Sequence, residues 1–221
     1  MFVGQPEFVE NPENRCPVVL LVDTSSSMAG GPIESLNTGL ATFRDAVTQD
    51  EQAALRVDVA IVGFGPVELV QDFVTIDQLV PPQLIANGLT PMGEAISYAL
   101  DLLESRKLTY RNNGIQYYRP WVFLITDGAP NPGSPWQQAA QRIQDAELQK
   151  KLSFFAVGVQ GADMNTLRQI APPARPPLML NGLDFKAMFL WLSDSMVRVS
   201  TSTVGGDMVA LPPVGWGQIA T

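Results

Sequence analysis

Residues 17–28 read PVVLLVDTSSSM, a run of apolar side chains that becomes polar in a single step at Asp23. A stretch that is apolar at every position is typical of a strand buried on both faces of a sheet, because a half-exposed strand would alternate. The serines that follow favour a turn. The stretch therefore predicts a central strand that ends at Asp23 and delivers a polar loop to the edge of a sheet.

The residues after this loop predict a helix that packs on the sheet. Pro32 suits the first turn of a helix. Apolar side chains then recur at intervals of three and four residues, at Ile33, Leu36, Leu40, Phe43 and Val47. That spacing places them on one face of an α-helix. A buried strand followed by an amphipathic helix indicates a βα unit.

Strands and helices continue to alternate along the chain. Further strands are predicted at 55–64, 67–74, 120–126, 152–159 and 178–180, and further helices from Thr90, Ser134, Asn165 and Asp184. The short Gly65-Pro66 connection favours a hairpin, so the strand at 67–74 is predicted to be an antiparallel edge. We therefore expect an α/β fold, a Rossmann-like open and mostly parallel six-stranded sheet with helices on both faces and one antiparallel edge strand.

Length and composition favour a single core. The chain has 221 residues, 46% of them hydrophobic, which is enough for one sizeable domain. We expect that domain over residues 15–202. Residues 1–14 are then an N-terminal extension, and residues 203–221 a tail rich in glycine and proline.

The charge and the missing residue types exclude several functions. A formal net charge of -8 predicts that neither nucleic acid nor an anionic membrane surface is a partner. Because the chain contains no histidine, it can hold neither a Ser-His-Asp triad nor a zinc site that needs imidazole. Cys16 is the only cysteine, and residues 1–15 have no signal-peptide pattern, so we expect a cytoplasmic protein.

Polar groups stand where the chain leaves a buried strand or enters a helix. They are Asp23, Ser25 and Ser27 after the first strand, Thr90 before a helix, and Asp127 after a later strand. All are oxygen donors, which suits a hard cation. Mg²⁺ is the leading candidate because it takes few protein ligands, while Mn²⁺ and Ca²⁺ are alternatives.

Each of these motifs also has a purely structural interpretation. Ser25 or Ser27 can fill a turn or cap the next helix, and Thr90 before Pro91 has the pattern of a helix N-cap. Asp127-Gly128 alone is a common turn dipeptide. Only their occurrence together, in this order, favours a metal site.

Three segments resemble the von Willebrand factor A domain and its metal-ion-dependent adhesion site. They are VVLLVDTSSSM (18–28), LTPMGEAI (89–96) and WVFLITDGAP (121–130), and the resemblance extends over roughly residues 15–202. The helix segment Asn37-Thr-Gly-Leu40 and the later FLWLSDSM (189–196) resemble more narrowly the bacterial TerY-type proteins linked with tellurium resistance.

The resemblance implies a metal site at the point where the strands ending at Asp23 and Asp127 lie side by side. Ser25, Ser27 and Thr90 are then expected to supply hydroxyl oxygens, directly or through water. Asp23 and Asp127 supply carboxylates that often act through water. Ser26 departs from the family, because many members have glycine there.

The resemblance also implies a function in binding rather than catalysis. An Asp or Glu side chain of a partner protein would complete the coordination of the metal. For TerY-type proteins the implied partners are a serine/threonine kinase and a PP2C-like phosphatase, in stress or tellurite-resistance signalling.

Two other functions remain open from the sequence. A Mg²⁺-dependent phosphatase could use Asp23 as its nucleophile, although haloacid-dehalogenase-like enzymes place a second aspartate where this chain has Ser25. No Walker A or Gly-x-Ser-x-Gly motif is present. The third function is a metal-independent scaffold that binds through Trp191, Trp216 and the tail.

Overall fold

The sheet is built around β1 (Cys16–Val22), the apolar run that the sequence places at its centre. In the computed structural model, which describes residues 6–206 and 209–219, β1 pairs in parallel with β2 (Val57–Phe64) and with β4 (Trp121–Thr126). β5 (Ser153–Gly158) extends the parallel sheet beyond β4. The central strand predicted from residues 17–28 is therefore confirmed.

Antiparallel strands form both edges of the sheet, whose order is β3-β2-β1-β4-β5-β6-β7. β3 (Val67–Thr75) is antiparallel to β2, as predicted. β6 (Leu178–Leu180) is parallel to β5, and β7 (Gly217–Ile219) is antiparallel to β6. The prediction of six strands is wrong because it omits β7, so the sheet has seven strands. The three residues of β7 lie in a glycine-rich tail and are too few to show an alternating pattern.

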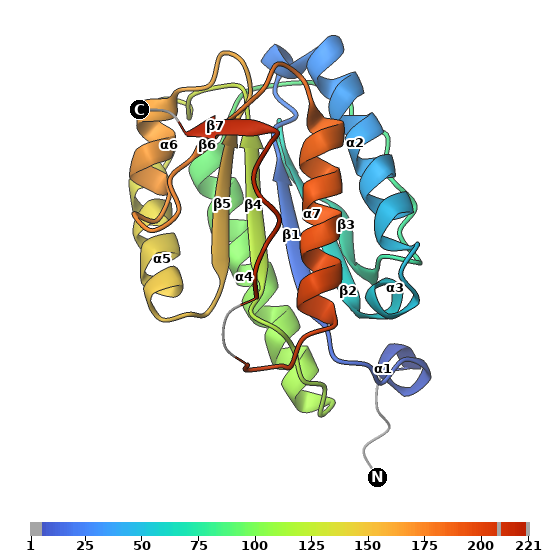
Figure 1. Cartoon of the computed structure of the whole chain (residues 1–221). Helices are drawn as coiled ribbons and strands as arrows, with labels where there is room; N and C mark the ends of the chain where they lie inside the picture. The colour runs from blue at the N-terminus through green and yellow to red at the C-terminus, as the bar shows by residue number, and fades with distance from the viewer. Residues whose placement is uncertain (1–5, 207–208, 220–221) are drawn as a thin grey trace.

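Helices cover both faces of the sheet (Figure 1). One face carries α2 (Gly31–Val47), α3 (Glu51–Arg56) and α7 (Phe185–Ser200), and the other carries α4 (Met92–Asn112), α5 (Trp136–Leu148) and α6 (Met164–Ile170). A single 3-10 turn, η1 (Ser26–Met28), separates β1 from α2. Within the described residues, no helix combines the length and the apolar character needed to cross a membrane.

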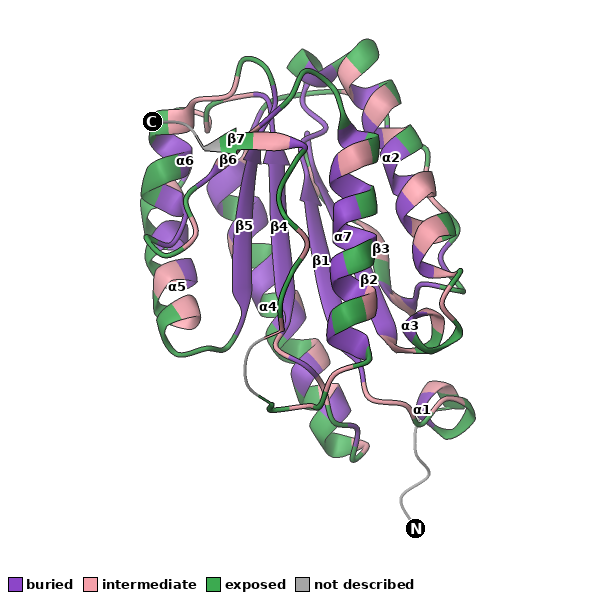
Figure 2. Cartoon of the chain, viewed as in Figure 1, coloured by how far each residue is buried: buried purple, intermediate pink, exposed green. Residues whose placement is uncertain are grey.

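The alternation of β1 explains why every one of its residues is apolar. Leu20 and Val22 pack into the core beneath α2 and α7, whereas Val19 and Leu21 pack into the core beneath α4 and α5. Figure 2 shows the central strands buried along their length between the two helical layers. The loops that follow the parallel strands therefore gather at one end of the sheet.

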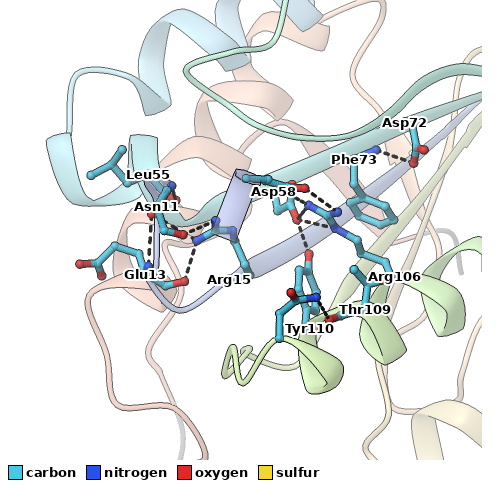
Figure 3. Close-up of polar contacts among 12 residues, drawn as sticks. Asn11, Glu13, Arg15, Leu55, Asp58, Asp72, Phe73, Arg106, Thr109 and Tyr110 are labelled. Carbon is cyan, nitrogen blue, oxygen red and sulfur yellow. Dashed lines mark hydrogen bonds and ion pairs between the residues drawn. The ribbon is translucent and has the colours of Figure 1, made fainter. Parts of the chain in front are cut away.

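The N-terminal segment lies at the end of the sheet away from these loops (Figure 1), and Figure 3 shows the polar contacts around Asp58, Arg106 and Tyr110 there. Phe8 of α1 (Pro6–Glu10) contacts the ring of Tyr110 edge to face. Asp58, fully buried in β2, accepts hydrogen bonds from Arg106 and from the Tyr110 hydroxyl. Glu7 also pairs with Arg106, so residues from α1, β2 and α4 form one ionic network that attaches the segment.

Candidate metal centre

The polar residues predicted from the sequence gather at the carboxyl end of the parallel strands. Val22 at the end of β1 pairs with Ile125 of β4, so the two chains leave the sheet side by side. β1 lies between β2 and β4. The chain first crosses from β1 to β2 on one side and later returns to β4 on the other side, so the carboxyl ends of β1 and β4 form the topological switch point of the sheet. The loops that meet there carry Asp23, Ser25, Ser27, Thr90 and Asp127.

Asp23 is held by hydrogen bonds to both of its carboxylate oxygens. The side chain is fully buried, and its Oδ1 accepts a hydrogen bond of 2.8 Å from the backbone N–H of Ser25. Its Oδ2 accepts a hydrogen bond of 2.5 Å from the hydroxyl of Thr126. The same hydroxyl accepts the backbone N–H of Gly128 at 3.1 Å. Thr126 therefore ties the end of β1 to the loop after β4.

Hydroxyl groups connect the buried part of the site to its surface. The Ser27 hydroxyl donates a hydrogen bond of 2.8 Å to Oδ1 of Asp127 and lies 3.0 Å from the hydroxyl of Ser25. Ser25 is 2% exposed, whereas Ser27 lies at the surface. Residues about a hundred positions apart in the sequence are thus joined, and their oxygens lead from the core to solvent.

Thr90 is placed by the loop that follows β4. Its backbone N–H donates to Oδ1 of Asn131 at 2.8 Å, and its carbonyl accepts the N–H of Asn131 at 3.0 Å. A methyl group placed on Gly128 would lie 3.5 Å from Oγ1 of Thr90 and 3.9 Å from Oδ2 of Asp23. Both oxygens therefore border the same small space, which stays open because residue 128 has no side chain.

Helix capping does not account for these residues. Ser25 precedes η1 without a capping hydrogen bond from its side chain, and the N-cap of α4 is Pro91 rather than Thr90. Ser134 has the spacing of a capping box before α5, but the N-cap there is Pro135 and no side chain caps the helix. The Ser134 hydroxyl accepts the N–H of Gly93 and donates to Glu94, so it joins the start of α4 to the loop before α5 instead.

The electrostatics of the site favour a bound cation. Burial raises the pKa of Asp23, hydrogen bonds from Ser25 and Thr126 oppose that rise, and the negative charge of Asp127 adds to it. Neither aspartate forms a salt bridge with a described residue. No three carboxylate, histidine or cysteine side chains cluster within the described residues, so a cation here needs the hydroxyl oxygens as ligands.

Two residues of the site have no distinguishing feature in the amino-acid sequence. Thr126 is part of an apolar strand, where a threonine is an ordinary strand residue. Asn131 lies in a loop rich in proline and glycine, where asparagine is an ordinary turn residue. Only the structure shows that these two side chains hold Asp23 and Thr90 in place.

Comparison with solved structures supports the fold. The proximal thread matrix protein 1 of the mussel byssus shares 21% identity, with a TM-score of 0.58 over 84% of this chain and 48% of that one. For the pilus adhesin SpaC of Lactobacillus rhamnosus GG in its open conformation, the identity is 14% and the TM-score 0.67, over 84% of this chain and 30% of that one. The chain thus spans about half or less of these two proteins.

A third solved structure matches over nearly its whole length. The vWF domain of the type V pili tip protein Mfa5 from Porphyromonas gingivalis has 12% identity and a TM-score of 0.60, over 87% of this chain and 98% of that one. No curated protein matches the chain. The model of the von Willebrand factor type A domain matches residues 18–188, which include all five predicted site residues. The chain therefore belongs to the von Willebrand factor type A domain family.

Proposed function

We propose that this protein is a metal-dependent binding module that recognises an acidic side chain of a partner protein. The observation that carries the proposal is the joined set of oxygens at the switch point. Two carboxylates without a basic partner and three hydroxyl groups meet there, and the set extends from the fully buried Asp23 to the exposed Ser27.

The donor set fits a hard divalent cation. Asp23, Asp127, Ser25, Ser27 and Thr90 are the residues that would hold it, and Mg²⁺ or Mn²⁺ suits oxygen ligands that leave positions for water. A solved relative, the TRAP protein of Plasmodium vivax, is described as manganese-loaded; it shares 19% identity over 80% of this chain and 74% of its own, with a TM-score of 0.50. That description supports a divalent cation here.

The charge balance supports an acidic partner. Three of the five donors are neutral hydroxyls, so only the two aspartates carry negative charge to balance a doubly charged cation. Both carboxylate oxygens of Asp23 already accept hydrogen bonds, which reduces the negative charge that Asp23 offers to the cation. A bound cation would supply positive charge to an Asp or Glu side chain that approaches from solvent.

The position of Asp23 argues against the phosphatase alternative. A nucleophilic carboxylate must reach the phosphorus atom with a free oxygen. Asp23 is fully buried, and each of its oxygens accepts a hydrogen bond. The scaffold alternative relied on Trp191 and Trp216 as binding residues. Both side chains are buried and contact each other edge to face, so they are not available to bind a partner.

The narrower assignment rests on the resemblance to TerY-type proteins in residues 37–40 and 189–196. It places the module beside a serine/threonine kinase and a PP2C-like phosphatase in the stress or tellurite-resistance signalling of a bacterium. This assignment and the cytoplasmic location stay predictions. Identification of the retained partner in the experiment below tests the assignment.

Adjacent serines offer a matched pair of variants. Ser27→Ala removes a hydroxyl that bonds Asp127, whereas Ser26→Ala removes an exposed hydroxyl of the same turn for which the structure gives no bond. We expect Ser27→Ala to weaken Mn²⁺ binding at least tenfold in a calorimetric titration, and Ser26→Ala to leave it unchanged. Equal affinities in the two variants would contradict the proposed ligand set.

Partner binding is tested in the same variants. The wild-type protein and both variants are immobilised and exposed to cell extract in Mg²⁺, and then in a chelator. We expect a partner that is retained only in Mg²⁺, by the wild type and by Ser26→Ala. Retention that survives the chelator in all three proteins would favour the metal-independent scaffold.

A further inference from the structure

A second concave site lies at the other end of the sheet from Asp23. It is a pocket of about 730 Å³, lined at its base by Pro120, Trp121 and Ser153, where β4 and β5 begin. In Figure 1 these are the lower ends of the strands, and the candidate metal centre is at the upper ends. Pockets of roughly 300 to 1,000 Å³ are typical of sites for small molecules.

Positive charge is concentrated around this pocket. Among the described residues its lining holds six of the chain's 14 basic residues and one of its 22 acidic residues, although the whole chain carries a net charge of -8. The basic residues are Lys107, Arg111, Arg119, Lys150, Lys151 and Arg175, and the acidic residue is Glu104. They come from α4, from the ends of α5 and of the strands, and from the loop before β6, so only the fold brings them together.

Glu147 holds two of the arginines in place without neutralising both. Its Oε1 accepts a hydrogen bond of 2.8 Å from Arg119 and also pairs with Arg175, while its Oε2 accepts the backbone N–H of Phe154 at 2.7 Å. Glu147 is 10% exposed at the side chain, and each arginine side chain is about one-third exposed. One carboxylate therefore orients two guanidinium groups that line the pocket.

Two lysines of the lining are free of such partners. Lys150 and Lys151 are exposed, and neither forms a salt bridge with a described residue. Lys150 has a φ of 56°, the only positive φ of a non-glycine residue in the described chain. A left-handed backbone is unfavourable for an L residue, and glycine or asparagine is the ordinary choice after a helix. A lysine thus occupies this position at the pocket, although the left-handed backbone conformation is unfavourable for it.

We propose that this pocket binds a small, multiply charged phosphate compound. Arginine guanidinium groups and lysine ammonium groups are the side chains that recognise phosphate, and several of them around one cavity match several phosphate groups. Ser153 adds a hydroxyl at the base of the pocket, and Val199 and Leu211 add an apolar wall. The concave shape and limited volume favour a compound of nucleotide size over an extended acidic chain.

The test uses metal-free protein, so that the candidate metal centre cannot contribute. Calorimetric titrations at low ionic strength measure the affinity for tripolyphosphate and for ATP, after the metal has been removed on a chelating resin and without chelator in the buffer. The pocket variant is Lys150→Asn with Lys151→Gln, since asparagine tolerates the left-handed backbone. The control variant, Arg44→Gln with Lys186→Gln, removes the same charge from residues outside the pocket lining.

We expect the wild type and the control variant to bind both probes alike, and the pocket variant to bind them at least tenfold more weakly. We also expect the affinity to fall as salt is added. Tighter binding of ATP than of tripolyphosphate would assign part of the recognition to the nucleoside, and equal binding would assign it to the phosphate chain. The proposal is overturned if the wild type binds neither probe, if the pocket variant binds like the control, or if an oligoglutamate peptide binds more tightly than both probes.

Discussion

Thr126 is predicted to be the residue on which the geometry of the metal centre depends most. Thr126→Val keeps the shape of the side chain and its suitability for a strand, and it replaces one hydroxyl by a methyl group. Two hydrogen bonds are lost, one to the buried Asp23 carboxylate and one from the N–H of Gly128. The substitution therefore removes polar contacts without creating a cavity.

The expected loss of stability follows from these two bonds. A hydrogen bond to a charged group contributes about 1.5 to 3 kcal/mol, and a bond between neutral groups about 1 kcal/mol. Burial of a methyl group in place of the hydroxyl returns about 1 kcal/mol. We therefore expect Thr126→Val to lower the free energy of unfolding by about 1.5 to 3 kcal/mol, measured by urea unfolding of the metal-free protein at neutral pH.

Thr126→Ser is the matched control. It retains the hydroxyl and loses only a buried methyl group, so its expected cost is about 1 kcal/mol. Mn²⁺ affinity should fall in Thr126→Val and stay near that of the wild type in Thr126→Ser. A loss below about 0.5 kcal/mol for Thr126→Val, or equal losses in the two variants, would refute the role assigned to the hydroxyl.

Three further predictions concern the fold. Gly93→Ala should lower the free energy of unfolding by about 2 kcal/mol despite its gain in helix propensity, because the new Cβ would lie 2.5 Å from the backbone nitrogen of Trp136. Gly31→Ala is the control, because its Cβ would meet only a side chain, at 3.4 Å, and it should leave the urea midpoint unchanged or raise it. Burial raises the pKa of the Cys16 thiol to about 12, so the stability that the buried thiol contributes is complete below pH 9 and is lost as the pH rises towards 12. Relative to Cys16→Ala, the wild type should lose about 1 kcal/mol between pH 8 and 10, and parallel pH profiles would contradict this. Trp216→Ala should cost about 3 kcal/mol in urea unfolding. Trp216→Phe should cost no more than about 1 kcal/mol, because the buried indole N–H has no hydrogen-bond partner among the described residues, and equal losses would show that ring burial is not the cause.

The convergence of Asp23 and Asp127 could be predicted because it follows from a general property of parallel sheets. Both residues end fully apolar strands, and such strands lie side by side in the centre of a sheet with their carboxyl ends together. The place of Thr90 before a helix and the resemblance to the family predict its part in the site. In the structure, Asn131 fixes the position of Thr90 by accepting a hydrogen bond from its backbone N–H. This contact depends on the conformation of a loop, which the spacing of apolar residues does not predict.

Other features depend on contacts between distant residues. β7 forms only because Gly217–Ile219 returns to the exposed edge of β6, and three residues carry too little pattern to predict a strand. The basic residues of the pocket are spread over positions 107–175, so its charge cannot be recognised in any single stretch of an acidic sequence. Such features need the fold before they can be recognised.

The two outer strands of the sheet also limit how the protein can associate. An exposed strand edge invites pairing with another chain, which can lead to aggregation. β7 offers only three residues at one edge. At the other edge β3 is longer, but it carries the exposed charges of Glu68 and Asp72, and its register with β2 shifts at Ile61. Both edges therefore discourage strand addition, so the proposed recognition of a partner would use side chains and loops at the ends of the sheet.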